Sequence, residues 1–178
     1  MDHADHVRLI RDGVEGAGPR WLELGAGSGA FMLALLDVLG DGAQVMALDR
    51  DAGALRRLEA DAARRFPAAR VTTLVADFTE PLPAEPASFD GVLMANALHF
   101  VRGKEPVLGA AMAVLKPEGR FVIVEYGSDL GNRWIPWAIS YPTWEQLAAD
   151  VGLRHTRKIG EVPSRMLGSI YAAVSAAP

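Results

Sequence analysis

The 178-residue chain contains no cysteine, and it contains no long apolar run. Without thiols it can form no disulfide framework, no thiolate metal site and no cysteine nucleophile. Asp37 interrupts the longest apolar stretch, residues 31–39, which is far shorter than the roughly 18 residues that a membrane helix needs. The first residues are charged from Asp2 onward and lack the apolar segment of a signal peptide. These absences predict a cytoplasmic protein without membrane insertion.

An excess of positive charge is also missing, because the formal net charge is −4. A general phosphate-backbone binder is therefore disfavoured, and no nucleic-acid partner is expected. Half of the residues are hydrophobic and 22% are charged, a balance that predicts a globular fold rather than a disordered chain. The length predicts one domain over residues 1–178, with a short N-terminal helix region (1–19) and a core (20–178).

The hydrophobic periodicity predicts alternating strands and helices. The expected strands are 20–24, 44–48, 71–75, 89–94 and 120–125, and the expected helices are 5–14, 31–39, 52–65, 105–115 and 143–151. Runs such as VLMA and FVIV indicate strands buried on both faces, as in a parallel sheet covered by helices. The last two strands, 154–161 and 166–175, are too close in sequence for a parallel crossover. We therefore predict an α/β fold with a Rossmann-like, doubly wound sheet of about seven strands, mostly parallel, ending in an antiparallel hairpin.

A glycine-rich turn, E-L-G-A-G-S-G-A at residues 23–30, joins the first strand to the next helix. Glycines there let the chain turn sharply and let a ligand approach the main chain. Gly25, Gly27 and Ala30 fit the dinucleotide pattern G-x-G-x-x-G/A, and Asp49 lies at about the distance expected of a ribose-binding acid. The glycines alone therefore leave a nicotinamide-dependent oxidoreductase open.

Two features favour a different cofactor. Glu23 precedes the first glycine by two residues and would face a cationic amine, whereas a pyrophosphate would be repelled by its carboxylate. Nicotinamide-binding domains also usually continue the parallel winding where this chain ends in a hairpin. The string E-L-G-A-G-S-G resembles the class I S-adenosylmethionine-dependent methyltransferases, in particular small-molecule enzymes of types 11 and 12, and the resemblance extends from residue 20 to about residue 176.

The resemblance implies a set of residues that bind S-adenosylmethionine and its product S-adenosylhomocysteine. Asp49 would hold the ribose hydroxyls, or else cap the following helix, and Asp77 would receive the adenine amino group, or else be an ordinary turn aspartate. Phe78 would lie against the adenine ring, and Asn96 would meet the methionine end. The full set implied is Glu23, Gly25, Ala26, Gly27, Gly29, Asp49, Arg50, Asp77, Phe78 and Asn96.

Methyl transfer from a sulfonium needs alignment, exclusion of water and, for some acceptors, removal of a proton. His99 is the best candidate base, since histidine exchanges protons near neutrality, although it could instead be a packing residue. Tyr126, Trp134 and Trp137 are candidates for binding the acceptor. Alternatively, the aromatic residues of this loop region, which include Tyr141 and Trp144, cover an open edge of the fold. The remaining histidines form no spaced cluster, so no metal is expected.

These observations predict methyl transfer to a small-molecule acceptor by in-line displacement. The alternatives are the nicotinamide-dependent oxidoreductase and a non-catalytic accessory protein that binds S-adenosylmethionine. A methyltransferase acting on bases is disfavoured because the segment Asn96 to His99 lacks the N/D-P-P-Y/F pattern. The short N-terminal region leaves little chain for a lid, so we expect either a small, loosely enclosed acceptor or a homodimer or other partner that completes the pocket.

Overall fold

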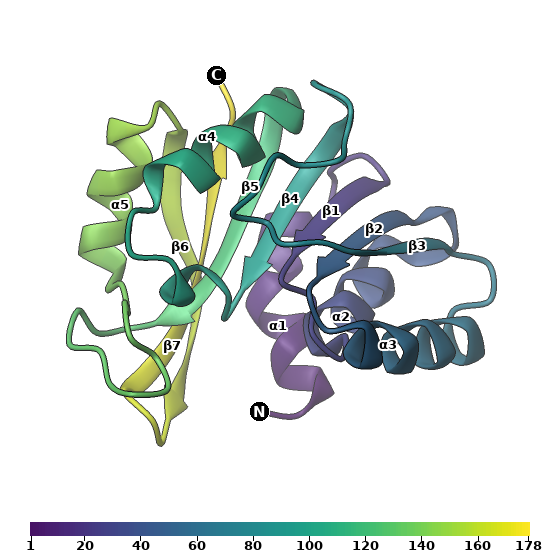
Figure 1. Ribbon diagram of the computed structural model, residues 1–178, viewed down its shortest axis with the longest axis horizontal. Coiled ribbons are helices and arrows are strands. Elements are labelled where there is room, and N and C mark those ends of the chain that lie inside the picture. Colours follow the sequence, from purple (N-terminus) through teal and green to yellow (C-terminus); the bar gives the residue numbers. More distant parts are fainter.

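The computed structural model describes residues 1–178 as one sheet with helices on both faces (Figure 1). The seven strands are β1 (Arg20–Leu24), β2 (Gln44–Asp49), β3 (Arg70–Val75), β4 (Phe89–Ala95), β5 (Leu115–Tyr126), β6 (Arg154–Ser164) and β7 (Gly168–Ala176). The helices are α1 (His3–Val14), α2 (Ala30–Leu39), α3 (Ala52–Arg65), α4 (Glu105–Val114) and α5 (Tyr141–Asp150), with short 3-10 turns η1 (Gly40–Gly42) and η2 (Leu98–Phe100).

The strand order in the sheet is β3-β2-β1-β4-β5-β7-β6. Strands β1 to β5 pair in parallel, whereas β7 pairs antiparallel with both β5 and β6. The predicted fold class, including the C-terminal antiparallel hairpin, is thereby confirmed. Because the parallel strands share one direction, the segments that follow β1, β2, β3 and β4 meet at a single edge of the sheet.

Each face of the sheet has its own apolar core. Helices α1, α2 and α3 pack on one face, where Ile10, Met32 and Leu58 are fully buried against the strands. Helices α4 and α5 pack on the other, where Leu108 and Trp144 are fully buried. The two faces explain the continuous apolar runs VLMA in β4 and FVIV in β5, since both sides of these central strands are covered.

Strand β3 departs from the expectation that the parallel strands are buried on both faces. It lies at the edge of the sheet and is largely accessible, with Val75 58% exposed. The segment that leads from β3 to β4 contains no helix, and its three prolines, at positions 81, 83 and 86, agree with the predicted loop. With no helix after it and no neighbour beyond it, β3 is covered less than the central strands.

Helix α5 begins two residues earlier than predicted, at Tyr141 rather than residue 143. Ser140 occupies the N-cap position, and its hydroxyl accepts the backbone N–H of Thr143. Pro142 stands in the first turn, where a missing N–H costs nothing because it would have no partner within the helix. The proline therefore starts this helix instead of delaying it.

Candidate active site

The turn between β1 and α2 depends on glycine for two different reasons. Gly25 has φ +79, and a Cβ there would lie 2.7 Å from the Cβ of Ala97 and 3.2 Å from the ring of Phe78. Its backbone N–H and that of Ala26 both donate to the carbonyl of Leu48, at 2.9 and 3.0 Å. At Gly27, with φ +53, no atom lies within 4 Å of the position a Cβ would take. The main chain is thus packed tightly at Gly25 and open to a ligand at Gly27.

Asp49 ends β2 and is tied to this turn by its carboxylate. Oδ2 accepts the backbone N–H of Gly27 at 2.7 Å, and Oδ1 accepts that of Asp51 at 2.8 Å. Asp49 is not the N-cap of α3, because Asp51 takes that role by accepting the N–H groups of Gly53 and Ala54. Each Asp49 oxygen keeps a further lone pair, so the side chain can still accept hydrogen bonds from a ligand.

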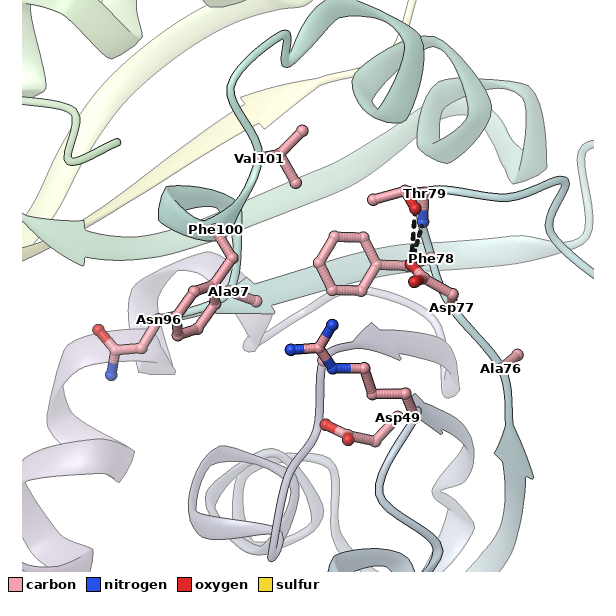
Figure 2. Close-up of a pocket in the computed structure, with 11 residues that line it drawn as sticks. Asp49, Ala76, Asp77, Phe78, Thr79, Asn96, Ala97, Phe100 and Val101 are labelled. Carbon is pink, nitrogen blue, oxygen red and sulfur yellow. Dashed lines mark hydrogen bonds between the residues drawn. The ribbon is translucent and has the colours of Figure 1, made fainter. Parts of the chain in front are cut away.

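A cavity of about 400 Å³ opens at the carboxyl edge, beside Asp49 (Figure 2). Of the residues predicted to bind a cofactor, six line it: Gly25, Asp49, Arg50, Asp77, Phe78 and Asn96. Five further lining residues were missed by sequence reasoning: Ala76, Thr79, Ala97, Phe100 and Val101. Most of these are small or apolar residues next to the predicted ones. Only Thr79, two residues after Asp77, has a polar side chain that could have marked it as a candidate in the sequence.

Asp77 and Asn96 lie at opposite ends of the cavity in Figure 2. Asp77 accepts the backbone N–H and the hydroxyl of Thr79 through Oδ1, at 2.9 and 2.7 Å. The hydrogen bond from the Thr79 backbone N–H, reinforced by that from its hydroxyl, lowers the pKa of Asp77. Asp77 is therefore a carboxylate at neutral pH. Its Oδ2 has no hydrogen-bond partner in the protein, so a donor that enters this end of the cavity could bind to it.

Two buried oxygens near the other end have no hydrogen-bond partner. They are Oδ1 of Asn96, which has the unusual φ of 51, and Oε2 of Glu23. Glu23 lies on β1 opposite Leu93 of β4, so it is buried beneath the edge and does not itself line the cavity. Burial, and then the negative charge of Asp49, raise the pKa of Glu23 well above its usual value. A hydrogen-bond donor that reached either oxygen would stabilise the site, because unpartnered buried acceptors are costly.

His99 and Glu125 form a buried pair next to the cavity. Nδ1 of His99 and Oε2 of Glu125 are 2.8 Å apart, and the backbone N–H of His99 donates to Oε1 at 3.1 Å. The imidazole meets the ring of Tyr126 edge-on at 5.6 Å. His99 does not line the cavity, although its neighbour Phe100 does. Sequence reasoning named His99 as a candidate base and missed its pairing with Glu125.

The aromatic residues after β5 divide between the two roles considered for them. Trp144 is fully buried and stacks on Phe121 at 5.5 Å, so it covers the sheet. Trp134 and Trp137 are 70% and 43% exposed, and each lies under an arginine guanidinium, that of Arg133 and that of Arg102 respectively. The Trp137 backbone N–H donates to the His99 carbonyl at 3.0 Å, which fixes this part of the loop beside η2.

No group of three or more acidic or histidine side chains comes together in a way that could hold a metal ion. None of the helices combines the length and apolar character required to cross a membrane.

The strand order, the glycine turn after β1 and the acidic residues that follow β2 and β3 define a class I methyltransferase domain of the kind that uses S-adenosylmethionine. A family model described as a methyltransferase domain matches residues 22–123, more than half of the chain, so the protein belongs to that family. Membership confirms the predicted class and favours S-adenosylmethionine over a nicotinamide cofactor.

Individual proteins show the same similarity. The chain is 38% identical over 116 residues to a demethylmenaquinone methyltransferase of Clavibacter sepedonicus, covering 63% of this chain and 43% of that one. It is 30% identical over 109 residues to the ubiquinone/menaquinone biosynthesis C-methyltransferase UbiE of Rhizobium leguminosarum bv. trifolii, covering 61% and 42%. The matches thus span less than half the length of these relatives. A SAM-dependent methyltransferase structure from Aquifex aeolicus shares the fold with a TM-score of 0.75 at 17% identity, covering 98% of this chain and 90% of that one.

Proposed function

We propose that the protein transfers the methyl group of S-adenosylmethionine to a small-molecule acceptor by in-line displacement. The observation that carries this proposal is the cavity at the carboxyl edge, with Asp77 at one end and Asn96 at the other. Its volume of about 400 Å³ suits a nucleoside-sized ligand.

The residues present fit this cofactor along the whole cavity. Asp49 would accept the ribose hydroxyls, Asp77 would accept the adenine amino group through Oδ2, and Phe78 would flank the adenine ring. The unpartnered oxygens of Asn96 and Glu23 would accept hydrogen bonds from the ammonium of the methionine end. Of the predicted turn residues Gly25, Ala26, Gly27 and Gly29, only Gly25 lines the cavity, and the open space at Gly27 would let a ligand approach the main chain, whereas Gly29 is packed against Leu58. Arg50 lines the same cavity next to Asp49.

The cofactor supplies an electrophilic methyl group on a positively charged sulfur. The protein's contribution is to align the acceptor with that group and to exclude water. Ala97, Phe100 and Val101 line the cavity with apolar surface beside Asn96. Because a sulfonium is already activated, the reaction requires no nucleophilic residue of the protein.

We further propose a flat, aromatic acceptor held by Tyr126, Trp134 and Trp137. The two tryptophans are exposed on the segment that follows β5, where Trp137 contacts His99 through its backbone, and they provide planar apolar surface. The names of the relatives refer to demethylmenaquinone and to ubiquinone and menaquinone, which carry quinone rings. A hydroquinone ring is therefore the first acceptor class to test.

Calorimetric titration with S-adenosylmethionine and S-adenosylhomocysteine, with NAD and NADP as controls, tests the cofactor. The protein should bind the two sulfur compounds and neither nicotinamide. Asp49→Ala should greatly weaken binding, whereas Asp51→Ala, which removes only the cap of α3, should preserve it at a cost of about 1 kcal/mol in stability. Binding of a nicotinamide cofactor instead would overturn the proposal.

Transfer itself is measured with methyl-labelled cofactor and reduced naphthoquinones. Labelled product would support an enzyme. Cofactor binding without transfer to any acceptor across a wide panel would favour the non-catalytic accessory protein. Size-exclusion chromatography coupled to light scattering, with and without cofactor, tests the homodimer expected to complete the pocket.

A further inference from the structure

The pairing of His99 with Glu125 says more about the acceptor than the cavity does. Glu125 is fully buried on β5, and His99 is 3% exposed on η2, yet both belong to the carboxyl edge of the sheet. Neither residue lines the cavity proposed for the cofactor, and neither has a buried, unpartnered side-chain atom of the kind that Glu23 and Asn96 offer to the ammonium. The proposed binding of the cofactor does not use this buried ionisable pair. The presence of the pair beside the proposed active site therefore indicates a different function.

Glu125 accepts two backbone N–H groups and contacts a ring nitrogen of His99. The Nδ1 of His99, the backbone N–H of His99 and the backbone N–H of Tyr126 lie at 2.8, 3.1 and 3.3 Å from its oxygens. A carboxylate can only accept, so Nδ1 must carry the proton in this pair. The neutral imidazole then keeps its lone pair on Nε2, free to take up a proton.

Nε2 is also the polar atom of the pair that remains accessible. The buried side-chain nitrogens and oxygens that lack a partner are those of Glu23, Asn96, Trp144 and Tyr171, and Nε2 of His99 is not among them. Nε2 makes no hydrogen bond either, so it reaches the molecular surface. The surroundings hold the ring in place, since Phe100 packs against it at 4.2 Å and Tyr126 meets it edge-on.

We infer that Glu125 positions His99 as a proton acceptor through Nε2, and that the acceptor is therefore a compound that loses a proton during methyl transfer. Phenolic and enolic hydroxyls, and ring carbons activated by such a hydroxyl, meet this requirement. A thiolate or a neutral amine can attack without a base and would leave the pair without a use. This inference rests on the proposed methyl transfer and narrows its substrate class.

The balance of the step is simple. The acceptor's O–H bond breaks, its proton moves to Nε2 of His99, and the electron pair left on the acceptor forms the new bond to the methyl carbon. The bond from that carbon to sulfur breaks with both electrons remaining on sulfur, and the imidazolium later returns its proton to water. Where a ring carbon is methylated, that carbon loses its proton when the ring regains its aromaticity and the oxygen takes up a proton again, so one proton is released to water overall.

Several other ionisable groups face this pair. Lys104 lies close enough for the charge of Glu125 to act on it, and its ammonium donates to the carbonyls of Val101 and Trp137 at 2.7 and 3.1 Å. Tyr171 lies opposite Glu125 on β7, and the hydroxyl of Tyr126 belongs to the ring that meets His99. Glu125 is the only one of these groups that contacts the imidazole with a carboxylate. Replacing Glu125 therefore tests the pair most directly.

The first experiment needs no acceptor. Protein with nitrogen-15 histidine, in complex with S-adenosylhomocysteine, is examined by NMR, and His99→Gln assigns the signal among the four histidines. We expect a protonated Nδ1 and an unprotonated Nε2 in the wild type, and loss of this preference in Glu125→Gln. A protonated Nε2 in the neutral wild-type ring would overturn the inference. Because this measurement needs no acceptor, it tests the inference even if no methyl acceptor is found.

The second experiment compares naphthol, naphthylamine and naphthalenethiol, which share one ring system and differ in the attacking atom. Naphthol should be methylated, and His99→Gln should lower that rate by about 10²–10⁴-fold while S-adenosylhomocysteine still binds. Methylation of the thiol or amine but not of naphthol would overturn the inference and leave the proposed methyl transfer intact. Absence of cofactor binding would overturn the proposed function instead.

The pH profile separates positioning from a merely structural role for Glu125. The rate with naphthol should fall at low pH as the imidazole becomes protonated. In Glu125→Gln this acid limb should move to lower pH, because a neutral amide stabilises the imidazolium less than a carboxylate does. Tyr171→Phe is the matched control, since it changes the residue opposite Glu125 and leaves the pair intact. An unmoved limb in Glu125→Gln would contradict the positioning role.

Discussion

The Asp49 carboxylate and the backbone N–H of Gly27 are 2.7 Å apart although 22 residues separate them in sequence. This hydrogen bond joins the end of β2 to the turn that follows β1. Asp49 therefore has two functions in the proposed site, since it holds the glycine turn in shape and faces the cavity that the turn borders.

Replacing Asp49 by alanine should consequently weaken the fold as well as the binding of cofactor. Two backbone N–H groups, those of Gly27 and Asp51, would lose their acceptor, at a cost of about 1 kcal/mol each. Asp77→Ala should weaken binding without a comparable loss of stability, because Asp77 is exposed and bonds only to Thr79 within its own turn. Urea unfolding without cofactor, followed by calorimetry, measures the two effects separately. Equal stability of the two variants would contradict the structural function of Asp49.

Glu23 should destabilise the protein when no cofactor is bound. Its pKa in the fold is raised well above the usual 4.5, mainly by burial, so the folded protein keeps a proton that the unfolded chain has lost. The unfolded chain then binds fewer protons, and the free energy of unfolding falls as the pH rises from about 4.5 toward the pKa in the fold.

Glu23→Gln should therefore raise the melting temperature of the cofactor-free protein at neutral pH, by about 2–4 °C for each kcal/mol recovered. The gain should shrink as the pH is lowered and vanish below about 4.5, where the wild-type carboxyl is protonated in both the folded and the unfolded state. The same variant should bind S-adenosylmethionine more weakly, because an amide cannot supply a negative charge to the ammonium. Scanning calorimetry over a pH series measures the stability, and Glu80→Gln, on the surface, serves as the control. A pH-independent gain would contradict the titration of Glu23.

Gly25→Ala should damage both folding and binding. The residue has φ +79, and the added Cβ would lie 2.7 Å from that of Ala97 and 3.2 Å from the ring of Phe78. The left-handed backbone alone costs about 1–3 kcal/mol, and displacement of Phe78 would disturb the proposed adenine end. Gly42→Ala is the matched control, because nothing lies within 4 Å of its Cβ position. Thermal unfolding and cofactor titration of both variants test this, and a fully binding Gly25→Ala protein would contradict the proposed packing.

The sequence predicted the sheet well because its central strands follow a simple physical pattern. Strands covered on both faces are expected to carry continuous apolar runs, as VLMA in β4 and FVIV in β5 do. The hairpin was predictable because the short connection allows only an antiparallel pair. The same pattern gave a wrong prediction of burial for β3. This strand is largely accessible because no helix follows it in the chain to cover it.

The placement of Asp49, Asp77 and Asn96 around one cavity was predictable because parallel strands bring the residues after them to a common edge. The pairing of His99 with Glu125 was not, since it depends on how β4 and β5 are aligned across an irregularity between Phe89 and Gly91. Nor could the pattern of tryptophans reveal that Trp144 is buried while Trp134 is exposed. Such facts arise from packing between segments distant in sequence.

Tyr171→Phe should leave the protein as stable as the wild type or make it more stable. The side chain is fully buried on β7, and its hydroxyl has no hydrogen-bond partner. An unpartnered buried polar group costs about 1–3 kcal/mol, and phenylalanine keeps the ring while removing the hydroxyl. Trp144→Phe provides the contrast, because Trp144 Nε1 is likewise unpartnered but the substitution also removes ring volume from a packed core. Chemical denaturation should therefore give changes of opposite sign, with the loss at position 144 arising from the cavity. A destabilised Tyr171→Phe protein would show that the hydroxyl has a partner, such as a buried water, that stabilises the fold.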